Sequence, residues 1–179
     1  MSAAANARRW GYHTLDPRAA RRIVAAAGIH PGDLVVDLGA GSGALTAPLV
    51  AAGARVVAAE LHPRRAAQLR QRFRCGESGR DVSRPVVEIR QGDLRTTPLP
   101  RTPYRVVANP PWSMVEELRD RLLRSPSLVR ADLVIPRWVA RKWAARYPRI
   151  TVGLSVPSSA FRPSAPTGAA VAVITGRHR

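Results

Sequence analysis

Short apolar runs alternate with amphipathic segments along most of the chain. The runs are rich in valine, alanine and leucine and are bounded by glycine, proline or charged residues, which is typical of buried strands. The segments between them repeat apolar residues at the spacing of a helix. The predicted strands are Leu34–Leu38, Arg55–Glu60, Val86–Arg90, Tyr104–Ala108, Ala131–Pro136, Thr151–Val156 and Ala169–Thr175. The predicted helices are Pro17–Ala27, Ala44–Ala52, Pro63–Arg74, Ser113–Arg124 and Arg137–Arg146.

The order of these elements predicts the fold class. Strands that alternate with helices form a mainly parallel sheet with helices on both faces, so we expect a Rossmann-like α/β fold with seven strands. We interpret residues 1–13 as a basic N-terminal arm, residues 14–179 as a single domain, and the polar segment Cys75–Pro85 as a surface loop. Ligands of such sheets bind beyond the carboxyl ends of the strands.

The chain is strongly basic. Its 179 residues include 29 lysines and arginines against 12 aspartates and glutamates, a formal net charge of +17. Lys142 is the only lysine, and the guanidinium group of arginine binds phosphate bidentately and stacks on bases. A GC-rich genome explains arginine in place of lysine but not the excess of cations, so a nucleic acid is the expected partner. The candidate RNA-binding residues are Arg8, Arg9, Arg137, Arg141 and Arg146. For the last three, a solvated helix face is the alternative.

Several other classes of protein are disfavoured. No apolar run approaches the ~20 residues that span a bilayer, and no signal-peptide hydrophobic stretch follows the first residues. We therefore expect a cytoplasmic monomer that makes no membrane contact. Cys75 is the only cysteine, which excludes an internal disulfide bond and a cysteine-based zinc site. We expect no metal, because the histidines show no metal-binding spacing, and we assign them no role. They are His13, His30, His62 and His178.

The segment Asn109-Pro-Pro-Trp112 directly follows a predicted strand. The side-chain oxygen of Asn109 and the carbonyl of Pro110 can both accept hydrogen bonds from one NH2 group, and Trp112 can stack on the ring that carries it. The prolines restrict the backbone, so these acceptors are held in place before a substrate arrives. The pattern indicates a site for an amine on a flat ring. The alternative is a strand that stops at a Pro-Pro turn, with Trp112 packed on the core.

A glycine-rich turn, Asp37-Leu-Gly-Ala-Gly-Ser-Gly43, follows the first predicted strand. Its glycines let the backbone approach a ligand closely, and its spacing also satisfies the dinucleotide pattern. An acid follows each of the first three strands: Asp37, Glu60 and Asp93. Asp37 would repel a pyrophosphate but suits the cationic end of S-adenosylmethionine, Glu60 can accept both ribose hydroxyls, and Asp93 can accept from an adenine amino group. Each acid alone is also explained as a helix cap or a solvated turn residue. The candidate cofactor-binding residues are Asp37, Gly39, Ala40, Gly41, Gly43, Glu60, Leu61, Asp93, Leu94 and Asn109.

Taken in order, these motifs resemble those of the Erm-type ribosomal RNA adenine N6-methyltransferases, the macrolide-resistance relatives of the dimethyladenosine transferases. The matching segments are Val35–Thr46, Glu60, Gln91–Asp93 and Asn109–Trp112, with Asp16–Pro17, Arg21–Val24, Pro136–Lys142, Ala160–Pro163 and Pro166. The resemblance implies a class I S-adenosylmethionine-dependent methyltransferase that acts on the N6 of an adenine in 23S ribosomal RNA or a precursor ribosomal particle. It also implies antibiotic resistance of the macrolide type. Asn109, Pro110 and Trp112 would be the catalytic residues.

The chain departs from this family in three places. Pro110 and Trp112 replace the usual Ile or Leu and Phe or Tyr, which resembles DNA adenine and protein-glutamine methyltransferases as much. The family's Gln-Asn-Phe stretch appears as Gly11–Leu15, and after Arg179 we expect no counterpart of the small C-terminal helical domain. Those two methyltransferase classes therefore stay open, as does a non-catalytic RNA-binding protein on the same fold. A nicotinamide oxidoreductase is disfavoured by Asp37.

Overall fold

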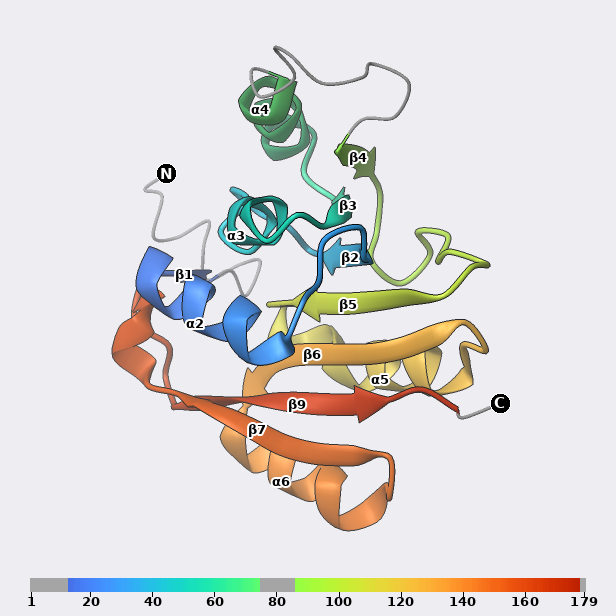
Figure 1. Ribbon diagram of the computed structural model, residues 1–179. Helices are drawn as coiled ribbons and strands as arrows, with labels where there is room; N and C mark the ends of the chain where they lie inside the picture. The colour runs from blue at the N-terminus through green and yellow to red at the C-terminus, as the bar shows by residue number, and fades with distance from the viewer. Residues whose placement is uncertain (1–12, 75–85, 178–179) are drawn as a thin grey trace.

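A computed structural model describes residues 13–74 and 86–177. Arg8, Arg9, most of the predicted arm and the whole predicted loop Cys75–Pro85 lie outside the described residues. The predicted α/β class is confirmed, since a seven-stranded sheet lies between two layers of helices (Figure 1). The sheet strands are β2 (Leu34–Leu38), β3 (Arg55–Glu60), β4 (Val87–Gln91), β5 (Tyr104–Ala108), β6 (Leu128–Pro136), β7 (Ile150–Val156) and β9 (Ala169–Thr175). The helices are α2 (Pro17–Ala27), α3 (Thr46–Ala51), α4 (Pro63–Arg74), α5 (Val115–Arg124) and α6 (Arg137–Arg146).

The strands follow the order β4-β3-β2-β5-β6-β9-β7. The first five strands in this order, from β4 to β6, are mutually parallel and include β3, β2 and β5. Strand β9 runs antiparallel to both of its neighbours, β6 and β7. After β2, strands β3 and β4 are added in turn on one side of β2, and β5 then pairs on the other side of β2. The switch in direction between β2 and β5 opens the crevice where doubly wound sheets bind ligands.

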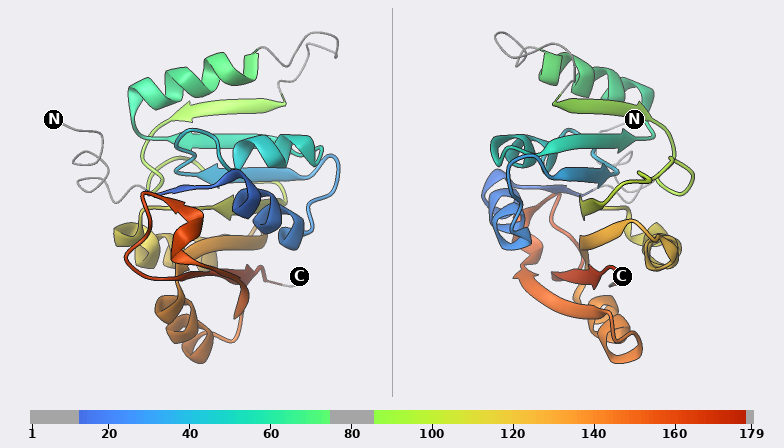
Figure 2. Two further views of the ribbon diagram at one scale, coloured as in Figure 1. Left: turned by 90° about the vertical axis from the view of Figure 1, so that its left-hand side faces the viewer. Right: turned by 45° about the vertical axis from the view of Figure 1, so that its right-hand side comes forward.

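Alternation of side chains along each strand creates two cores. On β2, Val36 and Leu38 pack on the face covered by α5 and α6, whereas Val35 packs on the face covered by α2, α3 and α4. Figure 2 shows the two helical layers on opposite sides of the sheet. Because both faces are covered, the strands are apolar throughout rather than alternating with polar residues. Among the described helices, none is both long and apolar enough to cross a membrane.

Most predicted elements match the structure, and the differences lie at their ends. The helix predicted from Ala44 begins at Thr46, because the turn after the glycines continues through Leu45. The helix predicted from Ser113 begins at Val115, after a 3-10 turn at Trp112–Met114. Strand β6 begins at Leu128, three residues before the predicted start, because its first residues pair with β5 and β9.

A second, two-stranded sheet was not predicted. Strand β1 (Thr14–Leu15) pairs antiparallel with β8 (Phe161–Arg162), and the Asp16 amide donates to the Ala160 carbonyl at 2.8 Å. This pairing joins the beginning of the described chain to the segment between β7 and β9. It places His13 beside the carboxyl edge of the main sheet, next to Asn109.

Candidate active site

A pocket lies at the carboxyl edge of the sheet, at the switch between β2 and β5. Its volume is about 670 Å³, including the part that opens to solvent. The segments that follow β2, β3, β4 and β5 each contribute to its wall. The lining residues are His13, Gly39, Ala59, Glu60, Leu61, Arg65, Gly92, Asp93, Leu94, Asn109, Pro110, Pro111, Trp112 and Met114. Most of the residues predicted to bind a cofactor or to act in catalysis are therefore brought together.

The glycine-rich turn is held against β3 by its own backbone. The amides of Gly39 and Ala40 both donate to the Ala59 carbonyl at 2.9 Å. Gly39 has a φ of 82°, a conformation that side-chain-bearing residues rarely adopt. A Cβ atom at Gly39 would lie 3.6 Å from Pro111 and 3.7 Å from Leu94. The turn therefore lies in contact distance of the Asn-Pro-Pro-Trp segment, and a side chain at Gly39 would be strained by the backbone conformation rather than by lack of space.

Glu60 ties the glycine turn to the end of β3. One carboxylate oxygen accepts from the Gly41 amide at 2.8 Å, and the other accepts from the His62 amide at 2.9 Å and from Arg65 Nε at 3.1 Å. The side chain is almost fully buried, yet it lines the pocket. A carboxylate has about four acceptor positions, so one acceptor position remains after these three bonds for a ligand hydroxyl. Arg65, in the first turns of α4, was not predicted to be part of the site.

Asp37 lies beneath the glycine turn rather than in the wall of the main pocket. It is 1% exposed and accepts a hydrogen bond from Thr46 Oγ1 at 2.7 Å. Burial, together with the negative charge of Glu60, raises the pKa of Asp37 to about 7, although the bond from Thr46 opposes the shift. A smaller adjoining pocket is lined by Asp37, His13, Gly41 and Asn109, among others. A cation in this smaller pocket would offset the cost of burying the carboxylate.

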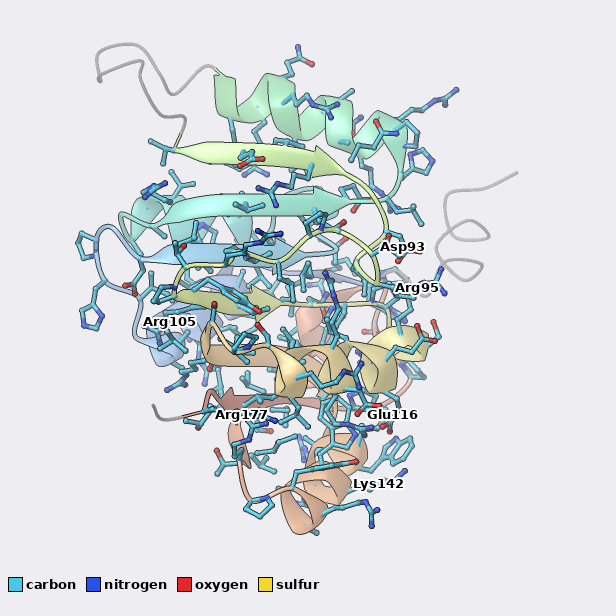
Figure 3. The ribbon with its side chains drawn as sticks, turned by 90° about the vertical axis from the view of Figure 1, so that its right-hand side faces the viewer. Asp93, Arg95, Arg105, Glu116, Lys142 and Arg177 are labelled. Carbon is cyan, nitrogen blue, oxygen red and sulfur yellow. The ribbon has the colours of Figure 1, made fainter. Side chains whose placement is uncertain are left out.

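Asp93 pairs with Arg95, a residue not predicted to belong to the site. Its carboxylate accepts from the Arg95 amide at 2.8 Å and from Arg95 Nε at 3.0 Å. This pairing with Arg95 holds the pKa of Asp93 below its usual value despite partial burial. Figure 3 shows Asp93 and Arg95 adjacent at the carboxyl edge. Beside them Leu94 is buried, whereas Leu61 is 44% exposed and supplies an apolar wall on which a flat ring can lie.

The orientation of the Asn109 amide follows from one contact. Asn109 Nδ2 donates to the backbone carbonyl of His13 at 2.7 Å. Because a carbonyl can only accept, the amide must present its NH2 group to His13 and its oxygen to the other side. From the sequence, this oxygen is predicted to accept from a substrate amine, and His13 has no predicted role. Only the long-range pairing of β1 with β8 brings His13 here, so no local pattern could have indicated it.

Trp112 is half-buried at the mouth of the pocket. Its ring centroid lies 5.8 Å from that of His13, with the planes tilted by 37°. Phe161 of β8, which is fully buried, meets Trp112 edge to face at 6.1 Å. Edge-to-face contact of this kind stabilises a particular ring orientation. The β1–β8 sheet therefore supports both the amide and the aromatic ring of the Asn-Pro-Pro-Trp segment.

The candidate RNA-binding arginines that the structure describes lie on α6. Arg137 is half-buried and donates from Nη2 to Ser155 Oγ at 2.7 Å, so part of its guanidinium holds β7. Arg141 and Arg146 are exposed, and the guanidinium carbon of Arg146 lies 6.0 Å from the centre of the Tyr147 ring. Their contact with RNA stays a prediction. Within residues 13–74 and 86–177, no group of three or more His, Cys, Asp or Glu side chains could hold a metal ion.

The chemistry of the pocket fits S-adenosylmethionine better than a dinucleotide. A pyrophosphate needs free backbone amides at the glycine turn, but the Gly41 amide is bonded to Glu60 and the Gly39 and Ala40 amides to Ala59. The carboxylates of Asp37 and Glu60 would also repel it. A ligand with a cationic centre and a ribose has complementary partners in Asp37 and Glu60.

The strand order, the lone antiparallel β9 and the glycine turn define a Rossmann-like class I methyltransferase fold. Within that class, residues 8–163 match the profile of the family described as Ribosomal RNA adenine dimethylase, and the chain belongs to that family. The expected resemblance to this group of enzymes is thereby confirmed.

Relatives and solved structures agree with this placement. The chain is 35% identical over 146 residues to the Ribosomal RNA small subunit methyltransferase A of Thermosynechococcus vestitus, a match that covers 77% of this chain and 52% of the relative. It is 34% identical to the rRNA adenine N-6-methyltransferase of Aeromicrobium erythreum, over 76% of this chain and 38% of that protein. The chain thus spans about half the length, or less, of these curated relatives. The crystal structure of the 23S rRNA methyltransferase ErmE superposes with a TM-score of 0.80 at 24% identity, covering 93% of this chain and 70% of that one.

Proposed function

We propose that the protein transfers a methyl group from S-adenosylmethionine to the exocyclic N6 of an adenine in ribosomal RNA. The observation that carries this proposal is the Asn109 amide, whose oxygen is turned away from His13, beside a pocket lined by Glu60 and a smaller adjoining pocket lined by the buried Asp37. Membership of the ribosomal RNA adenine dimethylase family supports the same reaction. We include a cytoplasmic location in the proposal, because ribosomal RNA is the substrate.

Some residues of the pocket bind S-adenosylmethionine, and others bind the target adenine. S-adenosylmethionine, when bound, supplies a methyl group on a positively charged sulfur. Asp37 offsets the positive charge of this ligand, and the remaining acceptor position of Glu60 accepts from one of its ribose hydroxyls. Asp93, as the sequence predicts, accepts from its adenine amino group, with Arg95 holding the carboxylate. Leu61 and Leu94 pack against the adenine ring.

The exocyclic amine of adenine is a poor nucleophile because its lone pair is delocalised into the ring. Asn109 Oδ1 and the Pro110 carbonyl accept hydrogen bonds from its two N–H groups and favour a pyramidal nitrogen, whose lone pair is then available for attack. With S-adenosylmethionine bound, N6 would take the methyl group as the carbon–sulfur bond breaks and leaves a neutral thioether, and one N6 proton would pass to solvent afterwards. The protein contributes alignment and electrostatic stabilisation rather than a strong base. Trp112 stacks on the extruded adenine.

We further propose 23S ribosomal RNA as the substrate, with macrolide-type antibiotic resistance as the consequence. The structural likeness to the 23S rRNA methyltransferase ErmE supports this assignment. Small-subunit ribosomal RNA is the second candidate substrate, because a relative named as a small-subunit methyltransferase is 35% identical to this chain.

The test is a transfer assay with methyl-labelled S-adenosylmethionine and separate 23S rRNA, 16S rRNA, genomic DNA and total protein. Label in 23S rRNA that digests to N6-methyladenosine or N6,N6-dimethyladenosine supports the proposal in full. Label only in 16S rRNA moves the assignment to the second candidate. Label in DNA or protein identifies one of the other two methyltransferase classes, and cofactor binding without label on any substrate supports a non-catalytic RNA-binding protein.

Asn109→Ala is the matched inactive control for this assay. We expect it to abolish transfer while S-adenosylmethionine still binds, because the amide contacts the amine rather than the ribose or adenine of the cofactor. Wild-type turnover by Asn109→Ala would contradict the proposed mechanism even if label appeared in RNA.

A further inference from the structure

The surface of α6 carries an aromatic side chain that the folded core does not use. Trp138 is 63% exposed, more than Leu61, Val129 or Val152, the other exposed large hydrophobic residues in the described ranges. A single exposed apolar residue is ordinary by itself. Trp138 differs from the other exposed apolar residues in its position and in the charges around it.

Trp138 lies just beyond the carboxyl edge of the sheet, one strand from the candidate active site. It is the second residue of α6, which begins directly where β6 ends. Strand β6 is paired with β5, and Ala108, the residue before Asn109, lies opposite Leu133. Strand β6 runs on to Pro136 before α6 begins, and adjacent strands are about 4.8 Å apart, so the first turn of α6 lies beyond the same edge of the sheet, one strand over from the segment that contains Asn109.

The side chains near Trp138 are positively charged. Arg141 and Lys142 follow it by three and four residues and therefore lie on the same side of α6. Both are exposed, and no acid occupies the first turn of the helix. Glu116 of α5 is 3.9 Å from Lys142 and offsets part of its charge. Figure 3 shows Lys142 and Glu116 on the side of the molecule that also carries Asp93 and Arg95.

We propose that Trp138 stacks on an unpaired RNA base that flanks the target adenosine, while Arg141 and Lys142 contact the adjoining phosphates. The inference rests on the proposed function and deepens it, because it says how the strand is held outside the pocket. Trp112 and Trp138 have different roles. Trp112 is half-buried against His13 and Phe161 and receives the target base, whereas Trp138 presents its ring to solvent.

A stacking platform suits single-stranded RNA rather than a duplex or a protein partner. Stacking needs an unpaired base with a free face and is tolerant of sequence. The cations beside the ring match the phosphates on either side of such a base. A second copy of this chain is the weaker occupant, because two faces that both carry Arg141 and Lys142 would repel each other.

The first experiment measures binding without turnover. Wild type, Trp138→Ala, Trp138→Phe and Val129→Ala are titrated with a fluorescein-labelled, unpaired RNA oligonucleotide over a series of salt concentrations. We expect Trp138→Ala to raise Kd about tenfold and Trp138→Phe to raise it less. Val129→Ala, which removes an exposed apolar side chain at the opposite end of β6, should match wild type.

The salt dependence separates stacking from charge and from misfolding. Trp138→Ala should leave the slope of log K against log salt unchanged, because stacking releases no counterion. Arg141→Ala should reduce the magnitude of that slope by about 0.7. A Trp138→Ala variant with wild-type Kd would overturn the proposal, and so would absence of RNA binding by wild type. Sedimentation of wild type as a dimer that Trp138→Ala dissociates would assign the ring to a second copy instead.

The second experiment uses methyl transfer to ribosomal RNA. Trp138→Ala should raise KM for RNA about tenfold, with kcat and the Kd of S-adenosylmethionine unchanged. A loss of kcat with an unchanged KM would contradict the platform. Failure of the proposed function is distinguishable, because wild type would then leave RNA unlabelled while its oligonucleotide binding still depended on Trp138.

Discussion

At the scale of single residues, Asp37 is a carboxylate placed where an apolar side chain would stabilise the fold more. It is surrounded by the end of β2 and the glycine turn, and Thr46 donates a hydrogen bond to its carboxylate. Its burial disfavours the ionised form. Under the proposed function, an ionised Asp37 attracts the cationic centre of the cofactor into the adjoining pocket. The proposal therefore assigns to Asp37 a gain in cofactor affinity at a cost in folding stability.

The pH dependence of stability follows from the pKa of Asp37, which rises from 3.8 to about 7 on folding. A raised pKa means that the folded state binds the proton more tightly than the unfolded state does. Protonation of Asp37 therefore adds to the free energy of unfolding in full below the unfolded pKa, and this stabilisation is lost as pH rises through about 7. The full shift corresponds to about 4 kcal/mol. We expect Asp37→Asn, whose amide oxygen can still accept from Thr46, to raise Tm at about pH 8 and to change it much less at about pH 5. Thermal unfolding at the two pH values is the measurement.

The same titration predicts how cofactor affinity varies with pH. Protonation of Asp37 removes the charge that favours a cationic ligand, so S-adenosylmethionine should bind wild type more weakly as pH falls below about 7. Asp37→Asn should bind weakly with little dependence on pH. Calorimetric titrations across this range provide the comparison. A wild-type affinity that is independent of pH would show that Asp37 does not face the cation.

Glu60 supports a third prediction at this scale. Glu60→Ala removes the acceptor for the ribose and releases the Gly41 amide, so S-adenosylmethionine should bind more weakly by about 1–3 kcal/mol. Glu88→Ala is the control, because Glu88 is an exposed carboxylate on the neighbouring strand that pairs with Arg90. Equal dissociation constants for the two variants would remove Glu60 from the cofactor site.

At the scale of elements, the limits of the long strands could be predicted from sequence more closely than the pairing between distant segments could. Buried runs such as Arg55–Glu60 and Tyr104–Ala108 are apolar and bounded by charged residues or proline, so their limits match the structure. The pair β1–β8 has only two residues on each side and joins residues about 150 positions apart, so no periodicity could indicate it. That pairing is also the reason why the contact between His13 and Asn109 was not predicted.

In the candidate site, too, the positions of the residues could be predicted from sequence, but their contacts could not. Asp37, Glu60, Asp93 and Asn109 could be predicted to gather, because the carboxyl ends of neighbouring parallel strands share one edge. Their hydrogen-bond partners depend on side-chain packing that follows from the tertiary structure. Glu60 meets the Gly41 amide nineteen positions earlier, across the interface of β2 and β3. The Asp93–Arg95 pair is local, and an arginine two residues after an acid in a turn was a usable signal.

Helix α2 depends on an arginine that comes from the sheet. Arg105 of β5 donates to the Gly28 carbonyl at 2.8 Å and to the Ala27 carbonyl at 2.5 Å, and it pairs with Asp33 at 3.1 Å. A cation at a helix C-terminus satisfies orphan carbonyls and interacts favourably with the helix dipole. We expect Arg105→Ala to lower the free energy of unfolding by about 2–3 kcal/mol in a urea titration. Arg101→Ala, an exposed arginine in the preceding turn, should leave the unfolding midpoint near wild type.

At the scale of the whole molecule, the sheet separates two edges with different tasks. Figure 3 shows Asp93, Arg95 and Glu116 toward the carboxyl edge and Arg105 and Arg177 toward the opposite edge. At the opposite edge Arg105 is committed to the C-terminus of α2. Arg95, which is exposed, lies beside Asp93 at the carboxyl edge, and Arg141 is exposed on α6. We therefore expect the net charge of +17 to act on RNA mainly through one side of the protein.

Salt titrations of RNA binding test this asymmetry. Five neutralised phosphates on a single strand correspond to a slope of about −3.5, so the affinity for ribosomal RNA should fall about 100-fold for a fourfold increase in salt. The affinity for S-adenosylmethionine should change far less, because that ligand is small and carries no phosphate. Arg141→Glu at the carboxyl edge should weaken RNA binding and flatten the slope, whereas Arg177→Glu, the matched charge reversal at the opposite edge, should have a much smaller effect. Equal effects of the two reversals would mean that the basic charge attracts RNA without orienting it toward the pocket.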